Sequence, residues 1–215
     1  MLLVERYDVG FLHTNCYFIK DKDTNSCAII DPGSKSTSLT NKVMEENDSI
    51  KYILLTHGHF DHIKEVKRYK DITNAKVVIY KSENVFLSNK VLNLSNGFKK
   101  NIVEPFSADI LLNDNETISL GNSIIKLIHT PGHTSGSSCY IIDNMIFSGD
   151  TLMKENIGRT DLATGDSSQL NSSLYKIINL KGDYIVYPGH GDITTLSHEY
   201  EYNPYIGEII DEYLS

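Results

Sequence analysis

The chain has 215 residues, of which 40% are hydrophobic and 22% are charged, and its formal net charge is −8. This length and composition predict an ordinary soluble globular protein, and we expect one domain over residues 1–215. The acidic balance argues against a nucleic-acid partner, which needs a surface rich in Lys and Arg, and no apolar run approaches the roughly 18–20 residues of a membrane span.

The cysteines Cys16, Cys27 and Cys139 are odd in number, and none belongs to a Cys-x-x-Cys pair. Each is flanked by apolar or aromatic residues, which predicts small buried side chains in a reducing compartment rather than disulfides or metal ligands. The N-terminus also lacks the basic start and long apolar stretch of a secretory signal. These features together predict a cytoplasmic protein with no membrane partner.

The first third of the chain predicts strands, turns and one helix. Strands are expected at residues 4–9, 16–19, 26–30 and 51–55. The turn Asp31-Pro32-Gly33 stops the third strand, so we expect the first three strands to be antiparallel. Residues 34–47 predict a helix with Ser34 as its N-cap. Its apolar stripe would contain Leu39, Val43 and Met44.

The rest of the chain predicts a second block of strands followed by helices. Strands are expected at residues 76–80, 110–112, 117–120, 123–128, 137–142, 145–148 and 183–187. Helices are expected at residues 81–91, around residues 170–178, and from Asn203-Pro204 onward. Residues 93–106 look irregular, and residues 153–166 predict a loop. A two-sheet sandwich with outer helices would bury the apolar faces of both blocks.

A cluster of metal-ligand residue types follows the apolar strand at residues 51–55. Within six positions the chain places His57, His59, Asp61 and His62. Histidine and aspartate are the usual ligands of a zinc-type metal, so the cluster predicts a metal site. Ile63, Val66 and Tyr69 then recur at helical spacing, which places the cluster on a strand-to-helix turn.

Three later apolar strands also end in a glycine followed by a ligand-type residue. They lead into Pro131-Gly132-His133, Gly149-Asp150 and Gly189-His190. Glycine allows a sharp turn that exposes the next side chain. Each of these segments alone is a weak signal, but together with the first cluster they predict that distant strand ends complete one metal site.

These motifs resemble the metallo-β-lactamase superfamily, within its glyoxalase II-like hydrolases. The family signature His-x-His-x-Asp-His is intact at His57 to His62, and the likeness extends from Asn15-Cys16-Tyr17 to the Pro-Gly-His of His190. The resemblance implies an α/β (α+β) fold, a four-layer αββα sandwich of two mixed β-sheets with outer helices. It also implies that the site lies at one edge, between the sheets.

The resemblance further implies two divalent metal ions, with zinc as the first expectation and iron or manganese as alternatives. It assigns His57, His59 and His133 to one ion. It assigns Asp61, His62 and His190 to the other, with Asp150 as a bridge. Asp61 and Asp150 would then be the catalytic carboxylates.

The remaining histidines and one turn aspartate have less specific predictions. Asp31 would lie close enough to hydrogen-bond a ligand histidine, with a plain turn aspartate as the equal alternative. His13 and His198 are expected at the surface or in loops. For His129 a structural role is favoured over a place in the cleft.

The chemistry implied is hydrolysis of a thioester of the S-2-hydroxyacylglutathione type by a metal-bridging hydroxide. Bound zinc lowers the pKa of water to about 7, so no serine or cysteine nucleophile is needed. A thiol leaving group, with a pKa of about 8.5, departs with little acid assistance. The β-lactamases of the superfamily commonly have cysteine or histidine at the position of Asp150, which argues against β-lactamase activity.

Arg159 is the candidate for binding a small anionic thioester or ester, because the resemblance implies a basic residue at this position that contacts a glutathione carboxylate. Arginine can bind a carboxylate through two hydrogen bonds. An internal pair with Asp161 is the equal alternative. Relatives of the glyoxalase II type have a tyrosine where Asp161 stands and a long C-terminal helical domain, whereas 25 residues follow His190 here (215 minus 190). The chain therefore resembles the compact single-domain bacterial branch. A single-iron persulfide dioxygenase and a lactonase are the alternative functions.

Overall fold

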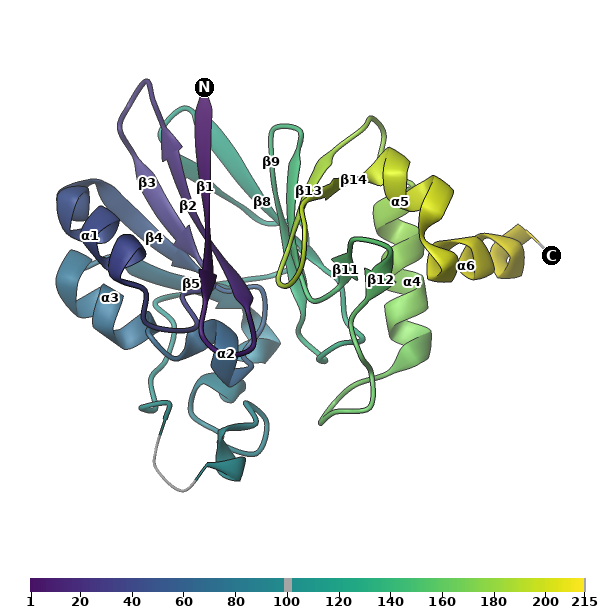
Figure 1. Cartoon of the computed structure of the whole chain (residues 1–215), viewed down its shortest axis with the longest axis horizontal. Helices are drawn as coiled ribbons and strands as arrows, with labels where there is room; N and C mark the ends of the chain where they lie inside the picture. The colour runs from purple at the N-terminus through teal and green to yellow at the C-terminus, as the bar shows by residue number, and fades with distance from the viewer. Residues whose placement is uncertain (99–101, 215) are drawn as a thin grey trace.

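The computed structural model describes residues 1–98 and 102–214, and within them two mixed β-sheets pack face to face with helices on both outer sides (Figure 1). The predicted four-layer αββα sandwich is confirmed. In Figure 1, α1 and α3 cover the outer face of the sheet that contains β1 to β5, and α4 lies on the opposite side of the molecule.

The first sheet has the strand order β1-β2-β3-β4-β5-β6. Its first three strands are antiparallel, as predicted, and the remaining neighbours from β3 to β6 are parallel. The strands are β1 Leu2–Val9, β2 Thr14–Asp21, β3 Cys27–Ile30, β4 Ile50–Leu54, β5 Lys76–Tyr80 and β6 Ile110–Leu112.

The second sheet has the strand order β14-β13-β10-β9-β8-β7. Its neighbours are antiparallel except for β10 and β13, which are parallel. The strands are β7 Thr117–Leu120, β8 Ser123–His129, β9 Ser138–Ile142, β10 Met145–Gly149, β13 Ile185–Pro188 and β14 Thr194–Thr195. A separate short hairpin is formed by β11 Leu152–Met153 and β12 Asn156–Ile157.

The helices belong to three groups. Those against the first sheet are α1 Thr37–Glu45 and α3 Val66–Thr73, preceded by the short α2 Phe60–Ile63. Those against the second sheet are α4 Ser167–Ile178, α5 Leu196–Tyr202 and α6 Pro204–Leu214. Short 3₁₀ helices are η1 Asn47–Ser49, η2 Lys81–Leu87 and η3 Ser95–Gly97. In residues 1–98 and 102–214 no helix is long and apolar enough to cross a membrane.

Alternation along the strands builds the layers. On β2, Tyr17 and Ile19 belong to the core between the sheets, whereas Phe18 belongs to the core beneath the helices. Because successive side chains of a strand point to opposite faces, a continuously apolar strand must be covered on both sides. The central strands β3 and β10 are fully buried for this reason.

Helix α1 begins later than predicted, because Ser36 rather than Ser34 is its N-cap and accepts the Leu39 amide hydrogen at 3.3 Å. The preceding turn is held against α2, and a Cβ on Gly33 would lie 1.3 Å from the Asp61 carbonyl oxygen. Gly33 can approach α2 this closely because it has no side chain.

Several smaller predictions differ from the structure. Met44 is 61% exposed, so only Leu39 and Val43 form the buried stripe of α1. The predicted loop at residues 153–166 contributes to the β11–β12 hairpin, and α5 was not predicted. Where a helix was predicted at residues 81–91, the structure has the shorter 3₁₀ helix η2. The stretch expected to be irregular at 93–106 contains the 3₁₀ helix η3, and its residues 99–101 lie outside the described residues. The three cysteines are buried with free thiols.

Tyr140 offers a test of how the sheets are joined. Its side chain is fully buried on β9, and its hydroxyl donates to the carbonyl oxygens of Leu55 (3.0 Å) and Val78 (3.3 Å) in the other sheet. Tyr140→Phe should lower the free energy of unfolding by about 1–3 kcal/mol, because a buried carbonyl loses its donor. Urea denaturation measures this, and Tyr200→Phe, at a 59% exposed position, is the control. Equal stability of both variants would contradict the prediction.

Candidate metal centre

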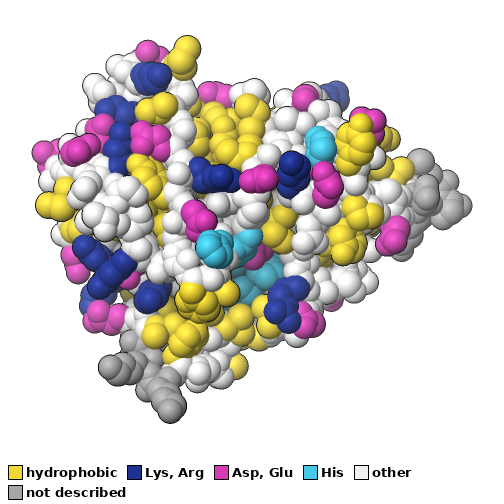
Figure 2. All heavy atoms as spheres, in the orientation of Figure 1, with side chains coloured by type: hydrophobic (Ala, Val, Ile, Leu, Met, Phe, Trp, Pro, Cys, Tyr) yellow, Lys and Arg dark blue, Asp and Glu magenta, His cyan; other side chains and the backbone are white. Residues whose placement is uncertain are grey.

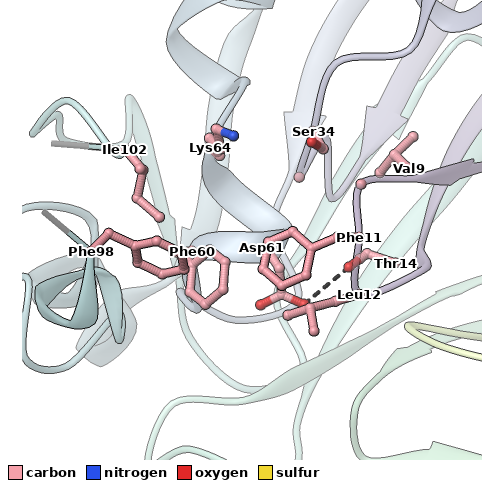
Figure 3. A pocket seen from close by; sticks show the side chains of 12 residues that line it. Val9, Phe11, Leu12, Thr14, Ser34, Phe60, Asp61, Lys64, Phe98 and Ile102 are labelled. Carbon is pink, nitrogen blue, oxygen red and sulfur yellow. Dashed lines mark hydrogen bonds between the residues drawn. The ribbon is translucent and has the colours of Figure 1, made fainter. Parts of the chain in front are cut away.

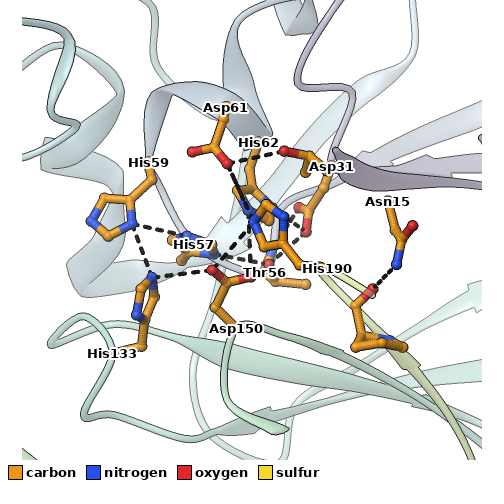
Figure 4. A network of polar contacts seen from close by, with 12 residues as sticks. Asn15, Asp31, Thr56, His57, His59, Asp61, His62, His133, Asp150 and His190 are labelled. Carbon is orange, nitrogen blue, oxygen red and sulfur yellow. Dashed lines mark hydrogen bonds and ion pairs between the residues drawn. The ribbon is translucent and has the colours of Figure 1, made fainter. Parts of the chain in front are cut away.

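The predicted metal ligands converge at one edge of the sandwich (Figure 4). The first sheet supplies His57 and His59 from the loop after β4, and Asp61 and His62 from α2. The loops after three strands of the second sheet supply His133, Asp150 and His190. Figure 2 shows histidine side chains gathered near the middle of one face, beside hydrophobic side chains.

Close backbone packing brings these loops together. Gly149 ends β10 with φ +51, and a Cβ there would lie 2.4 Å from the Thr56 hydroxyl oxygen. A Cβ on Gly189 would lie 2.1 Å from Asp150 Oδ1. The glycines before Asp150 and His190 therefore allow approaches that any other residue would obstruct.

The β2 strand fixes the loop that carries His190. The Asn15 amide nitrogen donates to Gly189 O at 2.7 Å, and its side-chain Nδ2 donates to Pro188 O at 3.0 Å. The hydroxyl of Tyr17 also donates to Pro188 O, at 2.6 Å. The Asn15-Cys16-Tyr17 motif thus joins the first sheet to a ligand-bearing loop of the second.

His57, His59 and His133 form the first group of candidate ligands. His59 Nδ1 lies 3.1 Å from His57 Nε2 and 3.0 Å from His133 Nε2. Two nitrogens bound to one tetrahedral zinc ion, each at about 2.0–2.1 Å, lie about 3.3 Å apart. The spacing of these three nitrogens therefore fits a shared ion.

Asp61, His62 and His190 form the second group. Asp61 Oδ2 lies 3.5 Å from His62 Nε2 and 3.4 Å from His190 Nε2. One carboxylate oxygen and two imidazole nitrogens thus face a common point, and nitrogen and oxygen ligands of this kind suit zinc and other first-row divalent metals.

Asp150 lies between the two groups. Its Oδ1 is 3.5 Å from His62 Nε2, and its Oδ2 is 3.5 Å from both His133 Nε2 and His190 Nε2. In the described part of the chain, neither Asp150 Oδ1 nor His62 Nε2 has a hydrogen-bond partner, although both atoms are buried. Buried polar atoms without partners are costly, and a cation between them would satisfy both.

The outward nitrogens of the ligand histidines are held by their surroundings. His133 Nδ1 donates to Arg159 O at 2.8 Å, and His190 Nδ1 donates to Leu12 O at 3.1 Å. A carbonyl oxygen can only accept, so each Nδ1 carries the hydrogen. The lone pair of Nε2 therefore points into the site, as a metal ligand requires.

Asp31 connects His62 to the strand end that precedes the cluster. Its Oδ2 lies 3.0 Å from His62 Nδ1 and accepts the Thr56 hydroxyl hydrogen at 2.6 Å, while Oδ1 accepts the Thr56 amide hydrogen at 2.9 Å. Asp31 has φ +50, a conformation that Asp and Asn adopt more readily than most residues. The turn aspartate thus contacts a candidate ligand, which is one of the two equal alternatives given for it.

The electrostatics of the cluster separate its histidines. Burial, followed by the nearby His133, lowers the pKa of His59 to about 3. Burial has the same direction at His62, but the carboxylates of Asp61 and Asp150 outweigh it and raise the pKa of His62 to about 10. The Asp150 pKa is lowered even though burial opposes this, because His62 and His133 favour its ionised form. The carboxylates therefore hold positive charge between them.

A cleft of about 480 Å³ opens over the cluster, a volume typical of small-molecule sites. Its apolar lining consists of Leu12, Phe60, Leu94, Met153, Ile157 and Leu162. Arg159 also lines it, with its side chain 62% exposed and bound to Asp161 through two contacts of 2.7 Å. The internal pair, which was the equal alternative to substrate binding, is thus formed at the border of the cleft.

A smaller cavity of about 50 Å³ adjoins the cleft and shares Leu12, Phe60 and Asp61 with it (Figure 3). Phe11 stacks against Phe60, with 6.4 Å between the ring centroids. From the same side the Thr14 hydroxyl donates to Asp61 Oδ2 at 3.0 Å. Thr14 was not among the predicted site residues, because no local spacing in the sequence links the start of β2 to α2.

The other histidines lie away from the cluster. His13 is exposed and lies 3.0 Å from Asp8, and His198 Nε2 lies 2.9 Å from Glu155. His129 stacks on Tyr80 with 4.0 Å between ring centroids, and it is not among the residues lining the cleft. The structural role favoured for His129 agrees with this packing.

Known proteins resemble this chain over nearly its full length. The model of the metallo-beta-lactamase superfamily matches residues 9–190. Hydroxyacylglutathione hydrolase GloC of Haemophilus influenzae is 32% identical, over 94% of this chain and 97% of that protein. The crystal structure of the BLEG-1 B3 metallo-beta-lactamase is 34% identical, with a TM-score of 0.88 over 95% of this chain and 99% of that one. The structure of TTHA1623 in a di-iron-bound form is 26% identical, with a TM-score of 0.79 over 94% of this chain and 99% of that one.

Asp31→Asn tests the contact between the turn and the cluster. Asparagine tolerates the positive φ but has one acceptor oxygen where the carboxylate has two, so Thr56 or His62 loses its partner. We expect the free energy of unfolding to fall by about 1–3 kcal/mol in denaturant titrations. Asp143→Asn is the matched control, because Asp143 has φ +54 in an exposed hairpin turn. A similar loss in both variants would show that the turn conformation, rather than the contacts of Asp31, determines the effect.

Proposed function

The chain belongs to the metallo-beta-lactamase superfamily, and we propose that within it this protein is a two-metal hydrolase of small anionic thioesters. The substrates would be of the S-2-hydroxyacylglutathione type. The similarity to GloC, which is described as a hydroxyacylglutathione hydrolase, supports this substrate class. The TTHA1623 structure holds two irons, which supports a site for two ions.

The position of Asp150 carries the proposal. Its two oxygens face both ligand groups, at 3.5 Å from His62, His133 and His190. A carboxylate so placed suits a bridge between two cations and gives the centre one shared negative charge. We assign His57, His59 and His133 to one ion, and Asp61, His62 and His190 to the other, with zinc as the expected metal and iron or manganese as alternatives.

Bound divalent ions would supply a water-derived nucleophile near neutral pH and would polarise a substrate carbonyl. The protein's own contribution is orientation. Asp61 and Asp150 direct carboxylate oxygens into the site, where they would accept hydrogen bonds from a water molecule held there. The hydroxyl of Thr14 donates a hydrogen bond that orients Asp61, and the contact with Asp31 orients the His62 ring.

The cleft favours a thioester with a charged end. Its apolar walls suit an acyl group and a thiol chain, and the Arg159 guanidinium suits a carboxylate through paired hydrogen bonds. A thiolate with a parent pKa of about 8.5 leaves readily, whereas the nitrogen of an opened β-lactam is a far poorer leaving group. The substrate must draw Arg159 away from Asp161, or bind beside the pair.

Three other reactions should be measured beside thioester hydrolysis. A lactone panel tests the lactonase alternative, and oxygen uptake with glutathione persulfide tests the single-iron persulfide dioxygenase. A chromogenic β-lactam is added because BLEG-1 is described as a B3 metallo-beta-lactamase. A rate with any of these that exceeds thioester hydrolysis would replace our proposal.

Asp150→Ala tests the shared carboxylate. We expect loss of bound metal, measured by elemental analysis, and a loss of thioester hydrolysis at least as large as the roughly 10–100-fold cost of removing a metal's outer-shell partner. Chelator treatment of the parent protein should abolish hydrolysis, and added zinc should restore it. Asp71→Ala, at an exposed position on α3, should change neither property. Near-parental turnover in Asp150→Ala with both ions retained would refute the assignment.

Arg159→Ala tests the recognition of negative charge. Because Arg159 is largely exposed, its contribution is screened, and we expect KM to rise about three- to tenfold for an anionic thioester and little for an uncharged one. Asp161→Ala frees the same guanidinium and should lower KM for the anionic substrate. Equal effects of Arg159→Ala on both substrates would instead favour a structural role for the Arg159–Asp161 pair.

A further inference from the structure

The 3₁₀ helix η2 places a carboxyl group beneath the metal-ligand loops. Glu83 lies on η2, which directly follows β5, and its side chain is completely buried. Glu83 belongs to none of the candidate metal-ligand groups. A buried glutamate is rare without partners, so its contacts require an explanation.

One oxygen of Glu83 contacts two ligand-bearing loops at once. Glu83 Oε1 accepts the Gly58 amide hydrogen at 2.9 Å and the Thr134 hydroxyl hydrogen at 2.9 Å. Gly58 lies between His57 and His59, whereas Thr134 directly follows His133. The three imidazoles of the first ligand group are therefore adjacent in sequence to the two donors of this one oxygen.

Both loops also pack tightly against η2. A Cβ on Gly58 would lie 2.3 Å from the Phe86 Cβ, and a Cβ on Gly136 would lie 2.4 Å from Glu83 Oε2. Thr134 is itself fixed, because its amide hydrogen is donated to Ser137 Oγ at 3.0 Å. These glycines allow η2 to sit directly under both loops.

The position of Glu83 is costly for folding. Burial raises the pKa of Glu83 to about 7, although the Gly58 amide, the Thr134 hydroxyl and the Gly136 amide oppose this. Its second oxygen, Oε2, is buried and has no hydrogen-bond partner within residues 1–98 and 102–214. A buried carboxyl with one unsatisfied oxygen is a poor choice for stability alone. Local rules of this kind are broken chiefly at functional sites.

We propose that Glu83 is a positioning residue that holds the His57–His59 loop and the His133 loop at the distance at which their three nitrogens share one metal ion. This inference rests on the proposed metal-dependent function. Glu83 bonds to Gly58 and Thr134 rather than to Asp61, His62 or His190, so the second ligand group should be independent of Glu83. The chemical class of the ion is that of the first site, a divalent cation with nitrogen ligands.

Two substitutions of Glu83 separate the effect of its side-chain length from the effect of its negative charge. Glu83→Gln keeps the length of the side chain and an acceptor oxygen but removes the charge. Glu83→Asp keeps the charge but withdraws the carboxylate by one bond, about 1.5 Å, so it cannot contact both donors. Positioning through Oε1 predicts that Gln preserves the site better than Asp does.

Glu199 offers a matched control. It is also fully buried, and it accepts hydrogen bonds from the Thr194 hydroxyl (2.6 Å), the Glu155 amide (2.8 Å) and Asn203 Nδ2 (2.8 Å). None of these partners is a candidate metal ligand. Glu199→Gln and Glu199→Asp therefore show the cost of altering a buried glutamate that has no contact with the ligand loops.

The first measurement uses metal-free protein and amide hydrogen exchange. In Glu83→Asp, segments 57–59 and 133–137 should both exchange faster than in the parent, whereas Glu83→Gln should stay close to it. In Glu199→Asp faster exchange should be confined to residues 194–203 and the amide of Glu155, which also donates to Glu199. Unchanged exchange of both ligand loops in Glu83→Asp would overturn the proposal, whether or not the protein binds metal.

The second measurement is zinc affinity by competition with a chromophoric chelator, with anomalous scattering from crystals to identify the affected ion. Glu83→Asp should weaken the ion held by His57, His59 and His133 about tenfold or more, and the other ion less than threefold. Glu83→Gln and both Glu199 variants should stay within about threefold for both ions. Equal weakening of the two ions, or none, would refute positioning. If the parent binds no ion, the proposed function fails, while the exchange result still decides the role of Glu83.

Discussion

The constraint on which this structure depends is the close approach of imidazole nitrogens from separate segments of the chain. His59 Nδ1 stands 3.0–3.1 Å from two other histidine nitrogens. Nitrogens this close require a proton or a cation between them, because their lone pairs would otherwise repel, so the surrounding protein must hold the rings in place. Strand ends, buried hydrogen bonds and glycine contacts all serve this purpose, and the carbonyl acceptors of His133 and His190 orient their rings.

Asp150 makes one centre from two groups of ligands. Its carboxylate is the shared neighbour of His62, His133 and His190, which come from different segments of both sheets. Negative charge at this point stabilises positive charge on either side, as the raised pKa of His62 shows. The acidic surface of the protein therefore says little about the site, whose local charge is set by a few buried groups.

Local sequence patterns were enough to predict most of the strands and helices. The features that were not predicted depend on contacts between residues far apart in the sequence. Alternating apolar strands and the i, i+4, i+7 spacing of α4 are visible in the chain itself, because burial on a sheet or helix face imposes a fixed period. The N-cap of α1 is Ser36 rather than Ser34, and the close packing of Gly33 on Asp61 just before it is not visible in the local sequence. For the site, the sequence itself indicates His57 to His62, because four ligand-type residues lie within six positions. The assignment of ligands to two metal ions came from the family resemblance. Glu83 and Thr14 act through residues far away in sequence, so their contacts become visible only in three dimensions.

The arrangement of the ligands across the two sheets has a thermodynamic consequence. His57 and His62 belong to the first half of the chain, and His133 and His190 to the second, so an ion in the centre would join the two halves of the sandwich. A ligand that binds only the folded state stabilises it by mass action, by about 2.7 kcal/mol at a concentration one hundred times its Kd. The population of opened molecules available to proteases would then fall as the free metal concentration rises. Under the proposed function, metal supply would govern the lifetime of the protein as well as its activity.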